Sequence, residues 1–471
     1  MRRKMYIGID VGTTNVKACI VSSSGKILAI SSSKSHIVIG SDGRVEQDGD
    51  EVWQSVQVVL KEMLKKVPSL SLKSLSLSTQ GGTIFFLDKK GRHLRPGITW
   101  MDTRVLRAGI KFPPDFDRKL FSVTGRYSSI GCLPFLQLLW LKKNEPEILR
   151  QTARYEFVDS FIYKKLTGHS VIDPSGAVMT MLYDIRKRKW NNNLLEIAGI
   201  KKARLPEILP SGSIVGTINP EIAGLTGLPK DIKVICGGHD QYCAALGSGV
   251  NNPGDILLSC GTAWAIVCVW HKPIFRFGSN FTPGPHVIQN RWGMLTAIPK
   301  GGAFFDWTLQ FLNTGDYEEA AYIAKVVPDG SGDLFFVPLD NGEGIFYGIG
   351  LHHNRQFLLK SVMEGLGFEV ASRIKTLQGL GIEPNCITMV GGAAKSEEWA
   401  RIISNITRLR VKVPQETESA CRGAAMLAAS EEKDFPKWET EYRIYIPAKK
   451  PSIIYSEKFR KYEKLKRIFS V

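Results

Sequence analysis

The chain opens with a strand-forming stretch at residues 6–21, which read YIGIDVGTTNVKACIV. Apolar residues alternate with small or polar ones on both sides of a Gly-Thr-Thr turn, which predicts two antiparallel strands joined by that turn. Residues 52–64 then place apolar side chains on one helical face, with Asp50 as the expected N-cap. Strands followed by helices indicate an α/β protein.

A diverged copy of this hairpin is expected in the second half of the chain. Residues 255–270 form two apolar runs around Gly261 and Thr262, and a strand-turn-helix unit starts at residue 387. We therefore expect two similar lobes, one of residues 1–246 and one of residues 247–471. No low-complexity stretch separates them.

The composition is that of a globular protein with a basic balance. The 471 residues include 62 Lys and Arg against 45 Asp and Glu, which gives a net charge of +17. This charge favours either a polyanionic partner or a weaker attraction to nucleotides and sugar phosphates. The densest basic stretch, residues 458–467, is interpreted as a solvated helix face. The sequence has no zinc-finger or RNA-recognition pattern, so no nucleic-acid partner is expected.

Cysteine use and hydropathy favour a reducing compartment. The eight cysteines form no C-x-x-C pair, which argues against a zinc or redox motif. The basic start at residues 1–4 is not followed by a signal-peptide cleavage site. The longest apolar run, residues 256–270, is too short to span a bilayer. We expect a cytoplasmic protein with no membrane partner.

The first hairpin turn carries groups suited to binding phosphate. Gly12 allows the turn to close, Thr13 and Thr14 offer hydroxyl groups, and Lys17 offers a cation. Asp10, at the end of the preceding strand, is a candidate ligand for Mg²⁺, directly or through water. The alternative is a plain turn capped by an aspartate.

Two further glycine turns could complete a nucleotide site. Gly261 and Thr262 repeat the first turn, and a triphosphate in a cleft needs donors from both walls. Gly391 and Gly392 lie at a strand-to-helix turn, where a flat adenine or a ribose could approach the backbone. The sequence contains neither a G-x-G-x-x-G fingerprint nor a P-loop, and each turn alone is equally compatible with a simple structural role.

An aspartate suited to catalysis follows the apolar strand at residues 232–235. Asp240 comes directly after Gly238 and His239, which suits a carboxylate at the end of a strand. Such an acid can orient a hydroxyl group and accept its proton during phosphoryl transfer. The alternative is an Asx turn. His239 is expected to be a structural or pocket-wall residue, because no second metal ligand stands at a suitable spacing.

The motifs and their order resemble those of the FGGY carbohydrate kinases over nearly the whole chain. The order of the motifs is more specific than any one of them. They occupy residues 7–14, 100–104, 138–141, 166–168, 238–240, 261–262, 346–365 and 391–392.

This resemblance implies two ribonuclease-H-like lobes around a central cleft, as in the actin, hexokinase and heat-shock ATPase superfamily. It implies ATP and Mg²⁺ as cofactors, Asp240 as general base and Asp10 as metal ligand. The implied phosphate and adenosine contacts are Gly12, Thr13, Thr14, Lys17, Gly261, Thr262, Gly301, Gly302, Gly391 and Gly392. The implied sugar contacts are Gln80, Trp100, Asp102, Asp240 and Gln241, with Arg104 supporting Asp102.

Some positions depart from the family pattern. Gln137 stands where a lysine is usual, Phe357 where a polar residue is usual, and Ala393 where the adenosine motif has its third glycine. After Gln80, residues 81–82 are glycines, whereas glycerol kinases resemble one another in carrying Arg-Glu and xylulokinases usually show Met-His. The missing side chains argue against glycerol and predict room for a different or larger sugar.

The expected function is that of an ATP-dependent sugar kinase acting on a ketose of five or six carbons, with a xylulose-like sugar favoured. Sugar acids and linear polyols are the alternatives within the family. An actin- or chaperone-like regulatory ATPase fits the first turn but not residues 100–104 or Asp240. A catalytically inactive sugar sensor is disfavoured because Asp10 and Asp240 are intact. A homodimer is left open.

Overall fold

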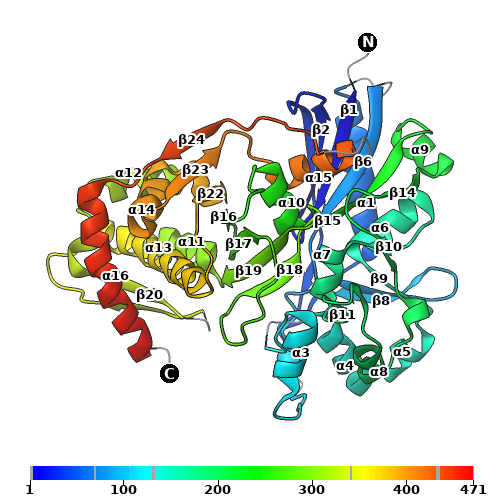
Figure 1. Cartoon of the computed structure of the whole chain (residues 1–471), viewed down its shortest axis with the longest axis horizontal. Coiled ribbons are helices and arrows are strands. Elements are labelled where there is room, and N and C mark those ends of the chain that lie inside the picture. The colour runs from blue at the N-terminus through cyan, green and yellow to red at the C-terminus, as the bar shows by residue number, and fades with distance from the viewer. Residues whose placement is uncertain are drawn as a thin grey trace. The chain divides into compact units, whose positions relative to one another are not determined.

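The computed structural model describes residues 4–67, 71–107, 109–129, 133–339, 342–430 and 435–469 (Figure 1). Its contacts divide the chain into two units. The first comprises Met1–Gly247, Thr282–Gly293 and Glu418–Glu439, and the second comprises Ser248–Phe281, Met294–Thr417 and Thr440–Val471. Each unit therefore draws on segments that are far apart in the sequence.

The main sheet of the first unit confirms the predicted N-terminal hairpin. Its order is β14-β15-β6-β1-β2-β3, in which β6 runs parallel to both β1 and β15, whereas β2 runs antiparallel to β1. Within the hairpin, Asp10 pairs with Lys17. The strands are β1 Met5–Val11, β2 Asn15–Ser22, β3 Ile27–Lys34, β6 Leu72–Thr79, β14 Ile214–Thr217 and β15 Lys233–His239.

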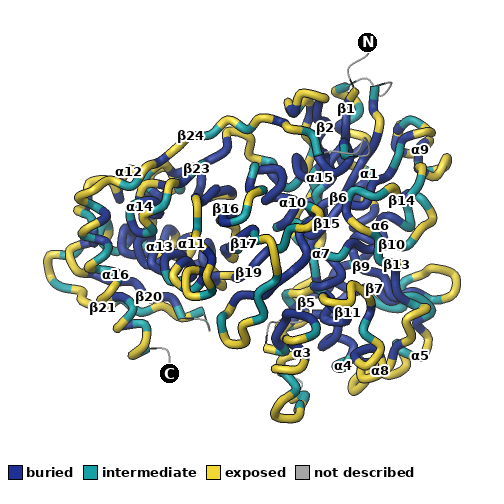
Figure 2. Tube along the Cα trace, in the orientation of Figure 1, coloured by how far each residue is buried: buried dark blue, intermediate teal, exposed yellow. Residues whose placement is uncertain are grey.

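Two helices cover opposite faces of this sheet. Ile7 and Ile9 of β1 belong to the buried core that includes the apolar face of α1 (Gly49–Leu64). Gly8 points the other way, because neighbouring residues of a strand face opposite sides, and it lies against α15 (Ser419–Ala429). Most of β1 and of α15 is coloured as buried in Figure 2.

The predicted N-cap of α1 is wrong by two residues. Asp48, not Asp50, caps the helix, and its Oδ1 accepts hydrogen bonds from the backbone N–H groups of Asp50 at 2.7 Å and Glu51 at 3.3 Å. Asp48 has the extended backbone that an N-cap needs (φ −80°, ψ 126°). Asp50 lies in the first turn, where a negative charge still stabilises the helix dipole.

Glycines let α15 pack backbone to backbone inside the first unit. A Cβ at Gly8 would lie 1.8 Å from the carbonyl oxygen of Cys421. Between α10 (Asp240–Gly247) and α15, a Cβ at Gly423 would lie 1.9 Å from the carbonyl oxygen of Cys243. Even an alanine at these positions would push the elements apart.

A smaller antiparallel sheet of the first unit has the order β4-β5-β8-β7-β9. Its strands are β4 Val38–Ile39, β5 Val45–Gln47, β7 Ile84–Leu87, β8 His93–Ile98 and β9 Arg154–Phe157. Further helices are α2 Arg104–Arg107, α3 Phe116–Thr124, α4 Pro134–Asn144, α5 Pro146–Gln151, α6 Val158–Thr167, α7 Pro174–Ala177, η2 Val178–Thr180, α8 Asn192–Ala198, η3 Lys202–Arg204 and α9 Pro220–Thr226. Short strands are β10 Val171–Ile172, β11 Tyr183–Asp184, β12 Lys189–Trp190, β13 Glu207–Ile208 and β18 Thr282–Pro285.

The second unit repeats the hairpin arrangement, as the sequence predicts. β16 pairs antiparallel with β17 and parallel with β22, so β17-β16-β22 matches β2-β1-β6 of the first unit. The strands are β16 Asp255–Cys260, β17 Trp264–Trp270, β19 Trp292–Ile298, β20 Phe335–Pro338, β21 Gly344–Tyr347, β22 Cys386–Gly391, β23 Arg410–Pro414 and β24 Tyr442–Tyr445. The helices are α11 Gly301–Phe311, α12 Tyr317–Lys325, η4 Ser331–Asp333, α13 Arg355–Gly379, η5 Gly392–Lys395, α14 Glu397–Thr407 and α16 Lys449–Phe469.

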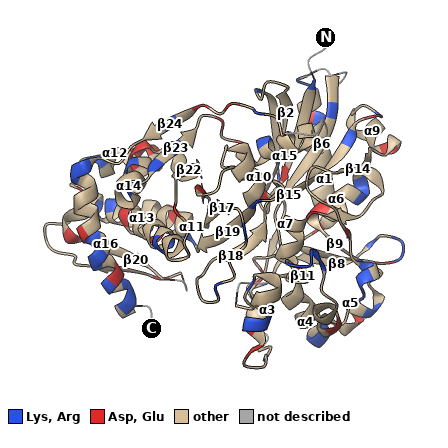
Figure 3. Cartoon of the chain, viewed as in Figure 1, with Lys and Arg blue, Asp and Glu red and all other residues tan. Residues whose placement is uncertain are grey.

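The basic C-terminal stretch lies on α16, which is anchored to the second unit by buried tyrosines. Tyr455 donates a hydrogen bond to Glu364 at 2.8 Å, and Tyr462 donates one to Glu369 at 2.7 Å. Burial raises the pKa of Glu364 to about 7. Lys466 contacts Glu369 as well. Several parts of the α16 ribbon are blue for Lys and Arg in Figure 3, and Arg460, Lys461, Lys464 and Arg467 are exposed. The helix thus combines a solvated basic face with a buried anchoring face.

Two further observations concern the cysteines and the hydropathy of the helices. Every cysteine that it describes is buried and outside any disulfide, and Cys132 lies outside the described residues. Within the described part of the chain, no helix is both long and apolar enough to span a membrane.

Replacing Gly423 by alanine tests the backbone contact between α10 and α15. The added Cβ would lie 1.9 Å from a backbone oxygen, so we expect a loss of about 1–3 kcal/mol, as for overpacked cores. The matched control is Gly224→Ala in α9, where an added Cβ meets nothing within 4 Å. This control should gain about 0.5–1 kcal/mol from helix propensity. Equal melting temperatures of the two variants would contradict the close approach.

Candidate active site

The carboxyl ends of three strands meet at one edge of the main sheet of the first unit. Asp10 of β1 pairs with Ser78 of β6, and Ser78 pairs with Gly238 of β15. Asp240 follows β15 directly and opens α10. Strand register therefore places the two predicted acids at the same edge, separated by the width of β6.

Asp240 lies in a poorly solvated position. Burial raises the pKa of its carboxyl to about 6, although hydrogen bonds from Gln241 oppose the shift. The side chain is 27% exposed, yet its Oδ1 is buried and has no hydrogen-bond partner among the described residues. His239 Nε2 lies 3.4 Å from this oxygen. Burial, followed by the charge of Arg126, lowers the pKa of His239 to about 4, so the imidazole is neutral at pH 7.

Asp10 is held by Ser78, whose hydroxyl donates to its Oδ1 at 2.6 Å. Burial raises the pKa of Asp10 to about 7, the negative charges of Asp240 and Glu418 add to this shift, and the Ser78 hydrogen bond opposes it. Two half-buried carboxylates therefore repel each other at this edge. An added cation would relieve that repulsion.

The predicted phosphate turn and the predicted sugar residues are linked by hydrogen bonds. Thr13 donates its hydroxyl to Gln80 Oε1 at 2.6 Å and accepts from Trp100 Nε1 at 3.0 Å. Gln80 in turn donates to Gln47 at 2.8 Å. Trp100 keeps 41% of its surface exposed, whereas Gln80 is buried. The turn and both sugar-site candidates thus form one connected group.

Lys17 is not an unpaired cation. Its Nζ lies 3.0 and 2.9 Å from the two carboxylate oxygens of Glu418, the residue that precedes α15. Burial alone would lower the pKa of Lys17, but Glu418 raises it above the ordinary value. The pair is close to neutral, so Lys17 offers a phosphate less net charge than the sequence suggests.

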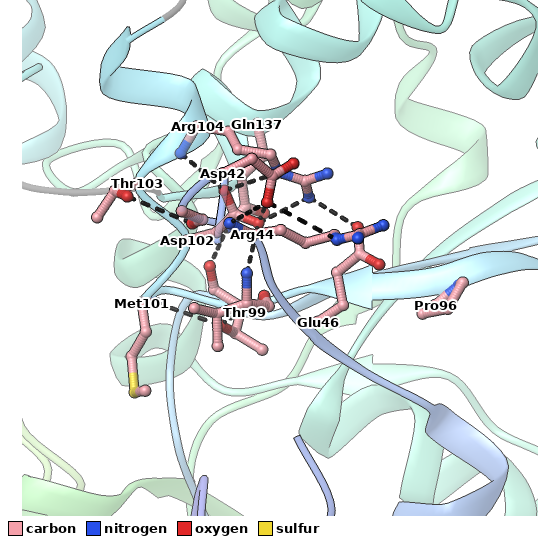
Figure 4. A network of polar contacts seen from close by, with 12 residues as sticks. Asp42, Arg44, Glu46, Pro96, Thr99, Met101, Asp102, Thr103, Arg104 and Gln137 are labelled. Atoms are coloured by element: carbon pink, nitrogen blue, oxygen red, sulfur yellow. Dashed lines mark hydrogen bonds and ion pairs between the residues drawn. The ribbon is translucent and has the colours of Figure 1, made fainter. Parts of the chain in front are cut away.

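Asp102 is fully buried within a polar network (Figure 4). Its carboxylate accepts from the backbone N–H of Val45 at 3.0 Å and from Arg104 Nη2 at 2.7 Å. Arg104 also reaches Glu46 at 2.7 Å, and its guanidinium lies 4.8 Å from the centroid of the Trp140 ring. The predicted support of Asp102 by Arg104 is confirmed. The network links the motif at residues 100–104 to the one at residues 138–141.

Gln137, which stands where the family usually has a lysine, joins two loops of this region by hydrogen bonds. Its Nε2 donates to the carbonyl oxygens of Gly82 at 3.0 Å and Thr99 at 3.1 Å. The side chain is buried. A neutral amide can hold two carbonyls without bringing an unpaired charge into the core.

The space beside the two glycines after Gln80 is already filled, contrary to the expectation of extra room. A Cβ at Gly81 would lie 2.8 Å from both His239 Cδ2 and Met179 Cγ. A Cβ at Gly82 would lie 2.9 Å from Trp100 Cβ, and its φ of +82° favours glycine. The glycines make room for side chains from other elements.

The predicted glycine turns of the second unit come together. Cys260 at the end of β16 pairs with Gly391 at the end of β22. A Cβ at Gly302 would lie 2.2 Å from the carbonyl oxygen of Gly261, and one at Gly391 would lie 2.6 Å from that of Cys260. Four residues of this group are exposed, namely Gly261, Thr262, Gly391 and Gly392, and the buried Gly301 and Gly302 adjoin them. Ala393 is buried beneath it.

Comparison with known proteins agrees with this geometry. Models of the N-terminal and C-terminal domains of the FGGY family of carbohydrate kinases match residues 5–247 and 257–431. The chain belongs to this family. It is therefore a carbohydrate kinase, a phosphotransferase, and the actin- or chaperone-like ATPase alternative is excluded.

Relatives of this FGGY kinase are similar over most of their length. Xylulose kinase of Escherichia coli (strain K12) is 26% identical over 86% of this chain and 85% of its own. Xylulose kinase of Bacillus subtilis (strain 168) is 28% identical over 90% of this chain and 88% of its own.

Solved structures confirm the predicted fold. Those of gluconate kinase and ligand-bound xylulose kinase from Lactobacillus acidophilus each reach a TM-score of 0.92 at 24% identity, covering 99% of this chain and 98% of theirs. The two-lobed α/β fold of the family is thus shared.

Three residues of the candidate site of this FGGY kinase were not predicted from the sequence. Ser78 lies on the same strand as the residues leading to Gln80, so strand alternation could have indicated it. Glu418 and Met179 come from distant segments and reach Lys17 and Gly81 only after folding. No spacing rule links such pairs.

Removing the carboxylate of Asp240 should stabilise the folded kinase at high pH. An aspartate in the unfolded chain titrates near 3.8 and folded Asp240 near 6, so the folded state holds more protons between these values. Stability therefore falls as pH rises through this window. We expect Asp240→Asn to gain about 1–3 kcal/mol at pH 8 and nothing at pH 4.

The measurement is the melting temperature of both proteins at the two pH values. The control is Asp88→Asn, because the hydrogen bond from the Arg92 backbone lowers the pKa of the Asp88 carboxyl instead of raising it. This control should show no gain at pH 8. A gain of equal size for Asp240→Asn at pH 4 would contradict the electrostatic origin.

Proposed function

We propose that this kinase transfers the γ-phosphoryl group of Mg-ATP to a hydroxyl of a ketose of five or six carbons, with Asp240 as general base. The observation that carries the proposal is the Asp240 carboxylate, which has a buried oxygen without a partner and a pKa of about 6. A xylulose-like ketose is the favoured acceptor because curated relatives are xylulose kinases.

The pKa of Asp240 suits proton transfer near neutral pH. At pH 7 most of the carboxylate is ionised, yet it remains basic enough to accept the proton of a sugar hydroxyl. The hydroxyl oxygen then forms a bond to the γ-phosphorus while the bond to the β-phosphate oxygen breaks, which yields a sugar phosphate and ADP. Neutral His239, 3.4 Å away, does not neutralise the base.

The carboxylate of Asp10 is suited to bind a Mg²⁺ ion that enters the site as a complex with the nucleotide. This carboxylate is destabilised by burial and by the charges of Asp240 and Glu418, and a dication would compensate them. Among the described residues no group of three or more His, Cys, Asp or Glu could hold a metal. One carboxylate with phosphates and water is the usual coordination of Mg²⁺ in kinases. Bound there, Mg²⁺ would neutralise charge on the phosphates.

In this proposal each unit has its own glycine-rich group for binding parts of a nucleotide. Gly12, Thr13, Thr14 and Lys17 of the first unit contact phosphates, with Lys17 acting as part of its pair with Glu418. The second unit supplies Gly261 and Thr262 for phosphates and Gly301, Gly302, Gly391 and Gly392 for adenosine. In this proposal the sugar-binding lobe is residues 1–246 together with the segments Thr282–Gly293 and Glu418–Glu439 of the first unit. The ATP-binding lobe is the rest of residues 247–471.

The sugar contacts in this proposal are Gln80, Trp100 and Gln241, beside the base. Gln80 and Trp100 are joined through their hydrogen bonds with Thr13. These bonds hold in place the side of the proposed acceptor site that Gln80 and Trp100 form, here called the acceptor wall. Met179 and His239 complete the wall where Gly81 leaves space. Because Asp102 has no exposed surface, it supports this wall from behind rather than by direct contact.

A sugar-acid acceptor is the second candidate, and Arg126 favours it. This guanidinium is 1% exposed and lies 3.4 Å from the sulfur of Met179 through Nη2. The guanidinium also donates to the carbonyl oxygens of Gly125 and Pro283, and it has no carboxylate partner among the described residues. Because the guanidinium is buried behind Met179, it would favour a carboxylate on the acceptor through its charge, without direct contact. An ADP-release assay over ketoses, aldonates and polyols separates the two candidates.

Replacing Asp240 by asparagine should abolish sugar-dependent ADP release. We expect kcat to fall by about 10²–10⁴-fold, the usual contribution of a general base, while the Kd for ADP by calorimetry stays unchanged. In the unmodified kinase, the acid limb of kcat should have its midpoint near pH 6, where Asp240 becomes protonated. A variant with full activity would remove Asp240 from this role.

Replacing Gly81 by alanine should impair acceptor binding more than nucleotide binding. The new methyl group would displace Met179 or His239, and a displacement of about 1 Å near the reacting groups can cost on the order of 100-fold. We expect KM for the acceptor to rise by about tenfold or more and KM for ATP to change by less than about twofold. Unchanged acceptor kinetics would show that the wall lies elsewhere.

A further inference from the structure

The strand end that carries Asp240 is irregular and needs support beyond the sheet. Pairing between β15 and β6 shifts between Ile235 and Gly238, which leaves a bulge. A Cβ at Gly237 would lie 1.7 Å from the carbonyl oxygen of Leu77, so only glycine fits there. Bulges re-aim the residues that follow them. The ladder resumes after the bulge with Gly238 opposite Ser78 and His239 opposite Thr79, and it ends there, so Asp240 lies beyond its last pair.

Tyr163 of α6 spans the bulge from one side. Its hydroxyl accepts from the backbone N–H of Gly237 at 2.6 Å and donates to the carbonyl oxygen of Ile235 at 3.3 Å. Tyr163 thus replaces the ladder bonds that the bulge disrupts. It contacts the strand three residues before Asp240 and leaves the last residues to another partner.

That partner is the hydroxyl of Ser175 in α7. Ser175 Oγ accepts from the backbone N–H of His239 at 2.9 Å, and His239 is the residue directly before Asp240. The same hydroxyl donates its proton to Asp173 Oδ2 at 2.6 Å. Ser175 is fully buried and Asp173 is 2% exposed. Because the Ser175 O–H points to the Asp173 carboxylate, the lone pairs of the serine oxygen remain free to accept the hydrogen bond from the N–H of His239.

Asp173 is itself fixed by several donors. Its Oδ2 accepts from the Ser175 backbone at 2.7 Å and from the Ser211 hydroxyl at 3.0 Å, and its Oδ1 accepts from the Gly176 backbone at 2.9 Å. Burial raises the pKa of Asp173, and these hydrogen bonds oppose the shift. The carboxylate has no freedom to turn away from Ser175.

We infer that Asp173 and Ser175 are positioning residues for Asp240, acting through the backbone of His239. This inference rests on the proposed role of Asp240 as general base. The pair fixes the position of the His239 N–H. Since Asp240 is the next residue, this also fixes the position of its Cα and the direction of its carboxylate. Neither residue touches the acceptor or the nucleotide in this assignment.

The test compares two serines that share Asp173. Ser175→Ala and Ser211→Ala each remove one hydroxyl that donates to Asp173 Oδ2, but only Ser175 also accepts from His239. We expect similar losses of melting temperature. Ser175→Ala should lower kcat by about 10–100-fold with KM for ATP within about twofold, because misplacing the reacting groups mainly costs kcat. Ser211→Ala should keep kcat within about twofold of the unmodified kinase.

Ser175→Cys separates the hydrogen bond from packing. A thiol has nearly the same shape but is a weaker donor and acceptor, so kcat should fall in the order Ser, Cys, Ala. The acid limb of kcat should also move to lower pH in Ser175→Ala, because a displaced carboxylate reaches more water. A Cys variant as fast as the serine enzyme, or an unmoved acid limb, would overturn the positioning role.

Asp240→Asn in the same assay distinguishes failure of the base from failure of its positioning. An inactive Asp240→Asn together with equal kcat losses for Ser175→Ala and Ser211→Ala overturns the positioning role alone. An active Asp240→Asn overturns the base and the positioning role together. An inactive Asp240→Asn with a selective loss for Ser175→Ala supports both.

Discussion

The parallel register of β1, β6 and β15 is the constraint on which the site of the first unit depends. It places Asp10, Ser78 and Gly238 in one row, and Asp240 follows the last of these strands. A shift of one strand by one residue would turn all of its side chains to the other face of the sheet. Gly8 and Gly237 preserve this register, because the backbone of a neighbour occupies the place of a Cβ at each.

The same register brings two acids into a poorly solvated edge, which costs folding free energy. Burial is the first cause of the raised pKa of both Asp10 and Asp240, and each would be more easily ionised in water. Sites that are prepared for charged substrates often carry such unfavourable interactions before binding. Hydrogen bonds from Ser78 and Gln241 limit the cost without removing it.

Local patterns were enough to predict the two hairpins, their glycine turns and the acids at strand ends, because these features depend on neighbouring residues. The N-cap at Asp48 rather than Asp50 shows the limit of such rules, since backbone conformation decides between two nearby aspartates. The Lys17–Glu418 pair joins residues 401 positions apart, which no local pattern reveals. The filled space beside Gly81 is likewise a matter of tertiary packing.

The late position of α15 in the chain has a consequence for biosynthesis. Gly8 is made long before Cys421, against which it packs, and the segment Glu418–Glu439 belongs to the first unit. At roughly 5–20 residues per second, the ribosome needs on the order of tens of seconds to supply that helix. Until then one face of the N-terminal sheet lacks its cover, so nascent chains are exposed to chaperones and to aggregation during that interval.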